Sequence, residues 1–212
     1  MQKLVDGVHS FQVEYFARHR ALFQQLAEVG QKPETLFITC SDSRVVPTLL
    51  TSAGPGELFI VRNVGNMVPH ITMPGGTAAA IEYAVEVLAV QNVIVCGHTH
   101  CGAIEAVLDP QRIERLPFVK RWLAPSDRVR TIVEQRYGEL QGTARHTAAV
   151  EENVLVQLEN LRAFPVVARR LEEGRLRMSG WVFKIETGAV FEFDPVVGQF
   201  TDIATHAIST AP

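Results

Sequence analysis

Apolar residues over positions 8–29 recur every three or four residues, a spacing typical of an amphipathic helix. Gly30 follows the last apolar positions and is typical of a helix C-terminus. The segment therefore predicts an N-terminal helical arm that ends near Gly30. The apolar positions that define it are Val8, Phe11, Val13, Phe16, Leu22, Phe23 and Leu26.

Short apolar runs alternate with helical patterns along the next part of the chain. Residues 35–40, 58–63 and 92–97 are short apolar runs, and we interpret each as a strand, the first of them buried. Strands that alternate with helices indicate a largely parallel sheet covered on both faces. Helical patterns fall on residues 77–90, 103–108, 118–123, 128–137, 144–163 and 165–173.

The C-terminal part carries a hairpin signal. Residues 178–185 and 189–194 flank Glu186-Thr187-Gly188, a turn between two strand patterns. We predict an α/β fold with a central, mostly parallel sheet of about four strands, a C-terminal hairpin strand and flanking helices. No repeat, low-complexity stretch or linker divides the pattern, so we expect residues 1–212 to form a single domain with an N-terminal helical arm.

Composition excludes several classes of protein. The 212 residues are 47% hydrophobic and 20% charged, which is an ordinary globular balance. A net charge of −3 gives no basic footprint for nucleic acid. The apolar runs are too short to span a bilayer, and the first thirty residues lack a signal-peptide pattern. We therefore expect a cytoplasmic protein with no membrane or nucleic-acid partner.

The chain has three cysteines, an odd number and few for its length, which argues against a disulfide framework. Cys96 lies inside the third apolar run, so we interpret it as a structural core residue. Cys40 and Cys101 instead stand among polar residues, next to the ends of the first and third strands. Both could be small buried hydrophobic residues, as free cysteines often are, but their positions also fit a metal site.

Cys40, His98 and Cys101 follow strand patterns and are expected to converge if the first and third strands are neighbours. Ligands of open α/β sheets bind outside the carboxyl ends of the strands, where the strand order reverses. Two thiolates and one imidazole form a zinc set that leaves one coordination position open. His100 is the alternative imidazole. We favour His98, because the His-x-x-Cys spacing lets two side chains reach one ion from a turn.

Asp42 and Arg44 are separated by one residue and can share a face of an extended or turning segment. Alone, the pair would be interpreted as a capping aspartate and a solvated arginine. Beside a metal, Arg44 would keep Asp42 ionised and aim its carboxylate, so that it can accept a hydrogen bond from zinc-bound hydroxide.

The pattern Cys40-x-Asp42-x-Arg44 followed by His98-x-x-Cys101 resembles the β-class carbonic anhydrases. The resemblance runs from the N-terminal helix to Gly180-Trp181 and includes Arg62-Asn63-Val64-Gly65-Asn66. The chain is most similar to the plant-like subgroup, which includes bacterial enzymes encoded beside cyanate degradation.

The resemblance implies an enzyme that reversibly hydrates CO2 to bicarbonate and a proton, with zinc-bound hydroxide as the nucleophile. It implies Zn²⁺ on Cys40, His98 and Cys101, a catalytic dyad of Asp42 and Arg44, and a homodimer or an assembly of dimers. On the substrate side it implies Gln31 reaching the site from the dimer partner, an apolar pocket of Phe59, Val64 and Tyr83, and the backbone of Gly102 close to the bound anion.

One departure from the family pattern concerns regulation. Members inhibited by a second, non-catalytic bicarbonate carry Trp and Tyr where this chain has Phe37 and Phe183, although the matching Arg62 is present. Without the indole N–H and the phenol O–H, Arg62 alone forms a poor anion pocket. We therefore predict that this chain has no such regulatory site.

Two alternatives stay open at this point. A structural zinc module would need a fourth protein ligand, for which His70 or His100 are candidates. A relative with redirected chemistry would keep the zinc and act as a lyase or hydrolase on a CO2 analogue such as carbon disulfide.

Overall fold

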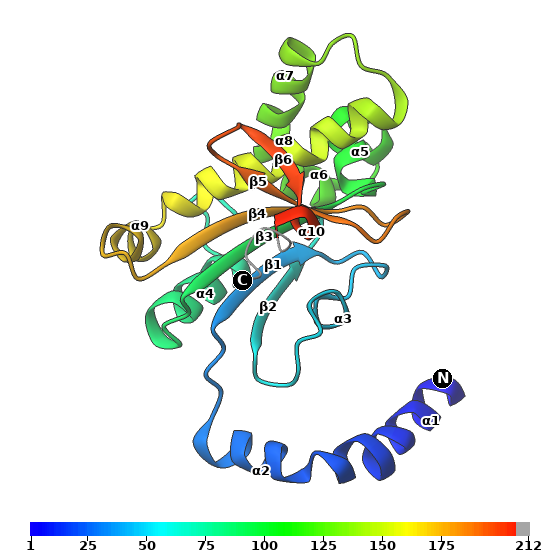
Figure 1. Ribbon diagram of the computed structural model, residues 1–212. Coiled ribbons are helices and arrows are strands. Elements are labelled where there is room, and N and C mark those ends of the chain that lie inside the picture. Colours follow the sequence, from blue (N-terminus) through cyan, green and yellow to red (C-terminus); the bar gives the residue numbers. More distant parts are fainter. Residues whose placement is uncertain (207–212) are drawn as a thin grey trace.

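The computed structural model describes residues 1–206; residues 207–212 of the predicted domain lie outside this description. Its centre is a twisted sheet with the strand order β2-β1-β3-β4-β5-β6 (Figure 1). Strands β1 to β4 pair in parallel, and β5 and β6 add to β4 in antiparallel fashion. The strands are β1 Thr35–Cys40, β2 Leu58–Asn63, β3 Asn92–His98, β4 Arg177–Phe183, β5 Val190–Asp194 and β6 Gln199–Asp202.

The predicted fold class, mostly parallel α/β with a C-terminal hairpin, is confirmed. The sequence pattern does not predict β6, a four-residue strand whose side chains are only partly buried and carry no clear alternation. The chain runs from β1 outward to β2 and then returns to β3 on the other side of β1. This reversal makes β1 and β3 neighbours with their carboxyl ends together, which is where an open α/β sheet binds ligands.

Helices cover the sheet, and their bounds differ from the predicted ones mainly at the ends. The predicted arm helix begins earlier, at Gln2, contains a π-helical segment at Phe11–Phe16 and is interrupted by a turn at His19. The helix predicted over 77–90 ends in a π-helical segment at Val87. Nowhere in residues 1–206 is a helix long and apolar enough to cross a membrane. The helices are α1 Gln2–Ser10, α2 Arg20–Val29, α3 Pro47–Thr51, α4 Gly76–Glu82, α5 Gly102–Leu108, α6 Pro117–Leu123, α7 Asp127–Arg136, α8 Gly142–Arg162, α9 Pro165–Glu172 and α10 Ile203–His206.

The long helix α8 packs directly on β3 and β4 because each strand has a glycine beneath it. A Cβ atom on Gly97 would lie 2.8 Å from Val154 Cγ2, and one on Gly180 would lie 2.8 Å from Val154 Cγ1. Both distances are shorter than real Cβ contacts, so any larger residue would push the helix off the sheet. This close packing holds the β3 end rigidly above the helix.

Alternate residues of β1 and β3 pack on opposite faces of the sheet, as the two-residue period of a strand requires. Val93 and Val95 join the large core under α8, whereas Ile94 and Cys96 join a smaller cluster with Phe37 on the other face. Cys96 is fully buried there, in agreement with its interpretation as a core residue, and burial raises the pKa of its thiol to about 12.

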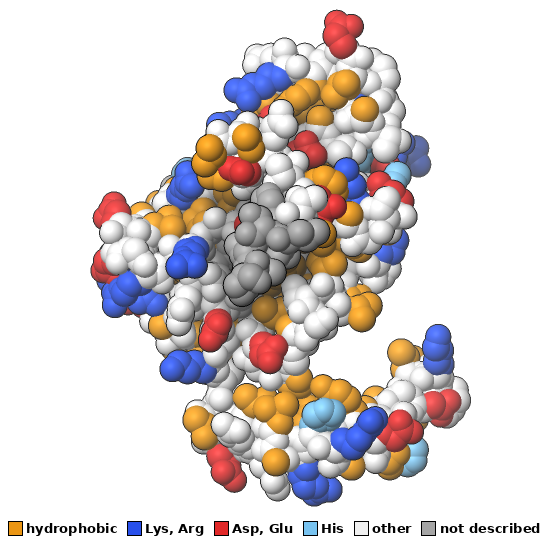
Figure 2. All heavy atoms as spheres, in the orientation of Figure 1, with side chains coloured by type: hydrophobic (Ala, Val, Ile, Leu, Met, Phe, Trp, Pro, Cys, Tyr) orange, Lys and Arg blue, Asp and Glu red, His pale blue; other side chains and the backbone are white. Residues whose placement is uncertain are grey.

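The N-terminal arm extends away from the sheet (Figure 1). Neither α1 nor α2 has a buried residue, although both carry apolar side chains. Figure 2 shows these side chains gathered along the arm. Contact with the body includes Leu26, whose side chain lies where a Cβ atom on Gly56 would stand. The exposed apolar residues of the arm include Leu4, Val5, Val8, Phe11, Val13 and Tyr15.

Candidate metal centre

The carboxyl ends of β1 and β3 bring Cys40, His98 and Cys101 together. Cys40 is the last residue of β1, His98 the last of β3, and Cys101 is the N-cap of α5. All three side chains are buried, and their ligand atoms lie within 4.8 Å of one another. The two sulfur atoms are 3.9 Å apart. Tetrahedral zinc with sulfur bonds of about 2.3 Å places its sulfurs roughly 3.8 Å apart, so the pair fits that geometry.

The His98 ring is held in the tautomer that a metal needs. Its Nδ1 lies 2.8 Å from the carbonyl oxygen of Thr99, and because a carbonyl only accepts, Nδ1 carries the proton. The other nitrogen, Nε2, is therefore unprotonated; it is buried and has no hydrogen-bond partner among the described residues. A buried lone pair without a donor is costly, and a cation beside the two sulfurs would satisfy it.

The two thiols share a single negative charge in the absence of a metal. A hydrogen bond from Cys101 is the largest influence on Cys40 and lowers the pKa of its thiol to about 4, against the opposing effect of burial. The same contact, together with burial, raises the pKa of Cys101. Backbone N–H groups of Ile104 and Ala103 at the start of α5 oppose this rise. With a cation bound beside them, both sulfurs could be thiolates, because the positive charge would offset the repulsion between them.

A glycine turn after β2 supports Cys40. The backbone N–H of Gly65 points at Cys40 Sγ, 3.4 Å away, and donates a hydrogen bond that stabilises the thiolate. Gly65 has φ +82°, a conformation that residues with a Cβ rarely adopt. A Cβ there would also lie 3.2 Å from the Cβ of Ala103.

Arg44 clamps Asp42 with both arms of its guanidinium. Its Nε donates to Asp42 Oδ1 at 2.9 Å and its NH2 to Oδ2 at 2.8 Å, while its backbone N–H donates to Oδ1 at 3.0 Å. These bonds, the side-chain ones above all, hold the pKa of Asp42 well below its usual range. Asp42 Oδ2 lies 3.8 Å from His98 Nε2, so the carboxylate is next to the candidate metal position without belonging to the ligand cluster.

Two arginines tie the surrounding loops together. Arg44 NH2 also donates to the carbonyl of His100, 2.9 Å away in the turn between β3 and α5. Arg62 donates to the carbonyls of Cys40 and Asp42, at 3.2 and 2.7 Å. Two N–H groups of Arg62 are therefore engaged by the backbone of the loop that carries Cys40 and Asp42.

His98 rather than His100 joins the cluster, as the spacing suggested. His100 has φ +55°, and its half-exposed ring lies 3.7 Å from Glu186 instead. His70 is also exposed and pairs with the hydroxyl of Thr72. Within residues 1–206 the group of ligand-type side chains therefore has three members, and neither candidate for a fourth ligand is near it.

His146 is a residue that sequence reasoning missed. From α8, its Nε2 lies 3.1 Å from the carbonyl oxygen of Cys101, and its ring stacks on His100 at 6.4 Å. Burial lowers the pKa of His146. No local signal marks this residue, because 45 positions separate it from Cys101. Only the packing of α8 beside α5 creates the contact.

The residues of the expected substrate pocket fall into two groups. Val64 precedes the glycine turn that contacts Cys40, and Gly102 is the exposed first residue of α5, directly after Cys101. Phe59 and Tyr83 contact each other, with ring centroids 6.0 Å apart. However, Phe59 pairs with Leu36, four residues before Cys40, which puts it about 13 Å along the strands from the cluster.

Gln31 is likewise remote from the cluster of its own chain. It is exposed and precedes the amino end of β1, whereas Cys40 closes the carboxyl end of that strand. A single chain thus brings together the metal ligands, the dyad, Val64 and Gly102, but not Gln31, Phe59 or Tyr83.

Comparison with known proteins identifies the family. Residues 35–190, which include every ligand of the cluster and the dyad, match the carbonic anhydrase family model. A carbonic anhydrase of Pseudomonas aeruginosa is 44% identical over 207 residues, covering 97% of this chain and 93% of that protein. The chain belongs to the β-class carbonic anhydrases. As an enzyme of this family it catalyses the hydration of CO2.

Solved structures of β-carbonic anhydrases share the whole fold. The β-carbonic anhydrase CcaA superposes with a TM-score of 0.93 at 43% identity, covering 95% of this chain and 91% of that one. One of two tetrameric β-carbonic anhydrases from the fungus Sordaria macrospora superposes with a TM-score of 0.83 at 29% identity, covering 94% and 98%. At 95% and 94% of this chain, both superpositions extend beyond the residues 35–190 that the family model matches.

Proposed function

We propose that this carbonic anhydrase holds Zn²⁺ on Cys40, His98 and Cys101 and hydrates CO2 with the help of Asp42 and Arg44. The observation that carries the proposal is the buried, unpartnered Nε2 of His98 beside two thiols whose sulfurs are 3.9 Å apart. A thiolate pair with one imidazole is a donor set that zinc favours. We expect the enzyme to work in the cytoplasm.

Zinc, when bound, lowers the pKa of a water molecule from about 16 towards about 7 and so makes hydroxide available at neutral pH. Two anionic thiolates donate more charge than imidazoles do, so activity should climb through mildly alkaline pH. Cys40, His98 and Cys101 would hold the metal and leave one coordination position for water. Asp42 Oδ2 lies 3.8 Å from His98 Nε2, next to this ligand cluster.

Asp42 would orient the reacting water. Because Arg44 occupies both carboxylate oxygens, Asp42 is held ionised, and these bonds oppose its binding to the metal. Each carboxylate oxygen keeps a further lone pair, so Asp42 can accept a hydrogen bond from the water and fix its attacking direction. The bond from Arg44 to the His100 carbonyl anchors this pair to the turn that carries Cys101.

CO2 has no charge that a protein group can grip, so its binding depends on an apolar surface beside the reacting water. Val64 offers one wall from the same chain. We propose that Phe59, Tyr83 and Gln31 are supplied by a partner chain, because they lie too far from the cluster of their own chain to serve it. The exposed apolar side chains of the arm are suited to pack against such a partner, and this contact would bury them. The assembly proposed is a homodimer or a set of dimers.

Mixed dimers test the partner contribution. Cys101→Ser and Gln31→Ala would be purified separately as inactive or weakly active proteins, then unfolded together, refolded with zinc and assayed. In a mixed dimer, the intact cluster of the Gln31→Ala chain receives Gln31 from its partner, so activity should rise above that of either parent. If Gln31 served its own chain, mixing would restore nothing. The Gln31→Ala protein, unfolded and refolded with zinc on its own, is the control for activity lost in handling.

The central proposal is tested by stopped-flow CO2 hydration paired with metal analysis of the same sample. We expect about one zinc per chain and activity that is lost on chelation and regained with zinc. Full activity in a metal-free sample would contradict the proposal.

A further inference from the structure

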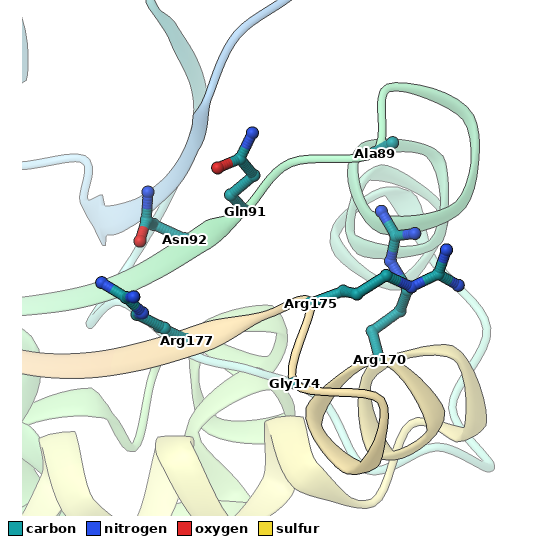
Figure 3. Close-up of a pocket in the computed structure, with 7 residues that line it drawn as sticks. All are labelled: Ala89, Gln91, Asn92, Arg170, Gly174, Arg175 and Arg177. Carbon is teal, nitrogen blue, oxygen red and sulfur yellow. The ribbon is translucent and has the colours of Figure 1, made fainter.

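A basic cavity lies at the opposite end of the sheet, near the amino ends of β3 and β4. It has a volume of about 460 Å³, within the range of small-molecule sites. Arg170, Arg175 and Arg177 line it together with the amides of Gln91 and Asn92 (Figure 3). No carboxylate side chain is among the described residues that line it.

The end of α9 places Arg170 and Arg175 side by side. The N–H of Arg175 donates to the carbonyl of Arg170 at 2.9 Å, and that of Gly174 donates to Leu171 at 3.0 Å. These are the two bonds of a Schellman motif, with Gly174 in the left-handed conformation at φ +64°. Figure 3 shows the two side chains extending in the same direction, towards the turn that carries Ala89. Their proximity is thus fixed by backbone structure.

Sheet register places Arg177 on the other side of the cavity. Arg177 pairs with Asn92 across β3 and β4, and its backbone N–H donates to the carbonyl of Gln91. Its side chain lies beside that of Asn92 in Figure 3. Guanidinium and amide donors therefore come from two strands and one helix end, all of which are ordered by main-chain hydrogen bonds.

The charge of this cavity is incompletely balanced. Arg175 is paired with Glu173, through both Nε and NH2. Arg170 and Arg177 have no ion pair with any carboxylate of residues 1–206, and the Nε of Arg170 is buried without a hydrogen-bond partner there. By contrast, the neighbouring Arg169 is paired with Glu86. Two guanidiniums without an ion pair and one unpartnered N–H therefore remain at a cavity whose only carboxylate contact is that of Glu173 with Arg175, among the described residues.

We propose that this cavity, which we call the arginine cavity, binds the phosphate group of a small molecule. A phosphate dianion matches the two unpaired guanidiniums in charge, and its oxygens accept the paired N–H donors of an arginine fork. The cavity is larger than one phosphate, and the amides of Gln91 and Asn92 provide donors and acceptors for an attached organic part. The proposal does not rest on CO2 hydration, because the arginine cavity is built from other residues than the metal centre.

Isothermal titration of the zinc-loaded enzyme with inorganic phosphate, AMP and acetate tests the proposal. We expect phosphate and AMP to bind and acetate to bind at least about tenfold more weakly, because a monoanion satisfies fewer guanidiniums. AMP binding more tightly than phosphate would identify an organic phosphate as the ligand, and equal affinities would identify free phosphate. Both outcomes support the arginine cavity; acetate binding as tightly as either would overturn the phosphate assignment.

The variant Arg170→Gln with Arg177→Gln should weaken phosphate binding by about tenfold or more while keeping CO2 hydration. Its matched control is Arg115→Gln with Arg121→Gln, which removes the same charge from two exposed arginines that have no ion pair among the described residues. The control should bind phosphate like the wild type. The proposal would be overturned if the wild type bound neither phosphate nor AMP, or if both double variants bound phosphate equally well. It would also be overturned if phosphate bound at the metal centre and the arginine changes had no effect.

Discussion

At the carboxyl ends of β1 and β3, buried sulfur and nitrogen ligands surround a position that one cation would satisfy. At the amino ends of β3 and β4, exposed guanidiniums surround a cavity that one anion would satisfy. The ligands of the first site are buried, and the ring of His98 is fixed by a hydrogen bond to the backbone of Thr99. At the second site, backbone hydrogen bonds fix the chain positions, and Glu173 holds the side chain of Arg175.

The two ends of the sheet differ in how much a bound ligand would contribute to their stability. Leaving a buried imidazole lone pair unsatisfied costs free energy, so the proposed cation would stabilise the carboxyl end. Arg175 and Arg177 are exposed and Arg170 is half-buried, so the proposed anion would contribute less to stability at the amino end. Loss of a ligand residue should therefore be severe at the carboxyl end and mild at the amino end.

The largest effect is expected for Cys101→Ser. The change replaces the thiol of Cys101, which is only 1% exposed, by a hydroxyl, which is a poor zinc ligand, so the protein should lose both zinc and CO2 hydration. Metal analysis and stopped-flow assays of the purified variant measure the two losses. Cys96→Ser is the control: Cys96 lies in the small cluster with Phe37 and Ile94 and outside the ligand group, so this variant should keep its zinc. Retention of stoichiometric zinc by Cys101→Ser would refute the ligand role.

A smaller effect is expected for Asp42→Asn. The amide keeps the size of the side chain but loses the charge-assisted fork with Arg44, so the group that orients the water is disturbed while the ligands stay. Zinc content should be unchanged and kcat/KM for CO2 should fall on the order of 10–100-fold. Wild-type turnover in this variant would remove Asp42 from the mechanism, and loss of zinc would make it a ligand instead.

A still smaller effect concerns the stability of the carboxyl end. Burial lowers the pKa of His146 below its ordinary value of 6.5, so the unfolded chain binds this proton more readily than the folded one. The contribution to the free energy of unfolding is full above pH 6.5 and declines as pH falls below it. Urea unfolding at pH 8 and pH 5.5 should show less acid loss for His146→Gln, which keeps an N–H donor, than for the wild type. His70→Gln, a change at an exposed histidine away from α8, is the control.

No inhibition through a second, regulatory bicarbonate site is expected at the carboxyl end. Arg62 already directs two of the five N–H donors of its guanidinium to the carbonyls of Cys40 and Asp42. Phe37 and Phe183 have no side-chain donor with which to complete a bicarbonate site. Hydration rates should therefore fall smoothly with added bicarbonate at low pH. Cooperative inhibition that Arg62→Ala abolishes would show that a regulatory site exists after all.

Much of the sheet could be predicted from the sequence. Residues 35–40 and 58–63 form strands within the predicted bounds, because short runs rich in β-branched and aromatic residues favour a strand over a helix. The arm was harder: its apolar spacing predicts one helix, but the structure interrupts it near His19, whose ring bonds back to the carbonyl of Tyr15. A local side-chain bond of this kind is invisible to periodicity.

The candidate site divides in the same way. The residue types of Cys40, His98 and Cys101, and their places after strands, are readable along the chain and led to the metal hypothesis. The separation of Phe59 from that cluster is not readable, since it depends on the register between β1 and β2. The contact of His146 with Cys101 depends on how α8 crosses the sheet, which Gly97 and Gly180 permit.

By itself, the sequence determined the alternation of strands and helices, the donor set for a metal and the family to which the chain is similar, because these depend on residue types and short spacings. Only the tertiary structure decided that β1 and β3 are neighbours, that Arg44 holds Asp42 away from the ligand cluster, and that three arginines meet at the far end of the sheet. The physical reason is that strand order and register join residues many positions apart, and those pairings follow from packing the whole core.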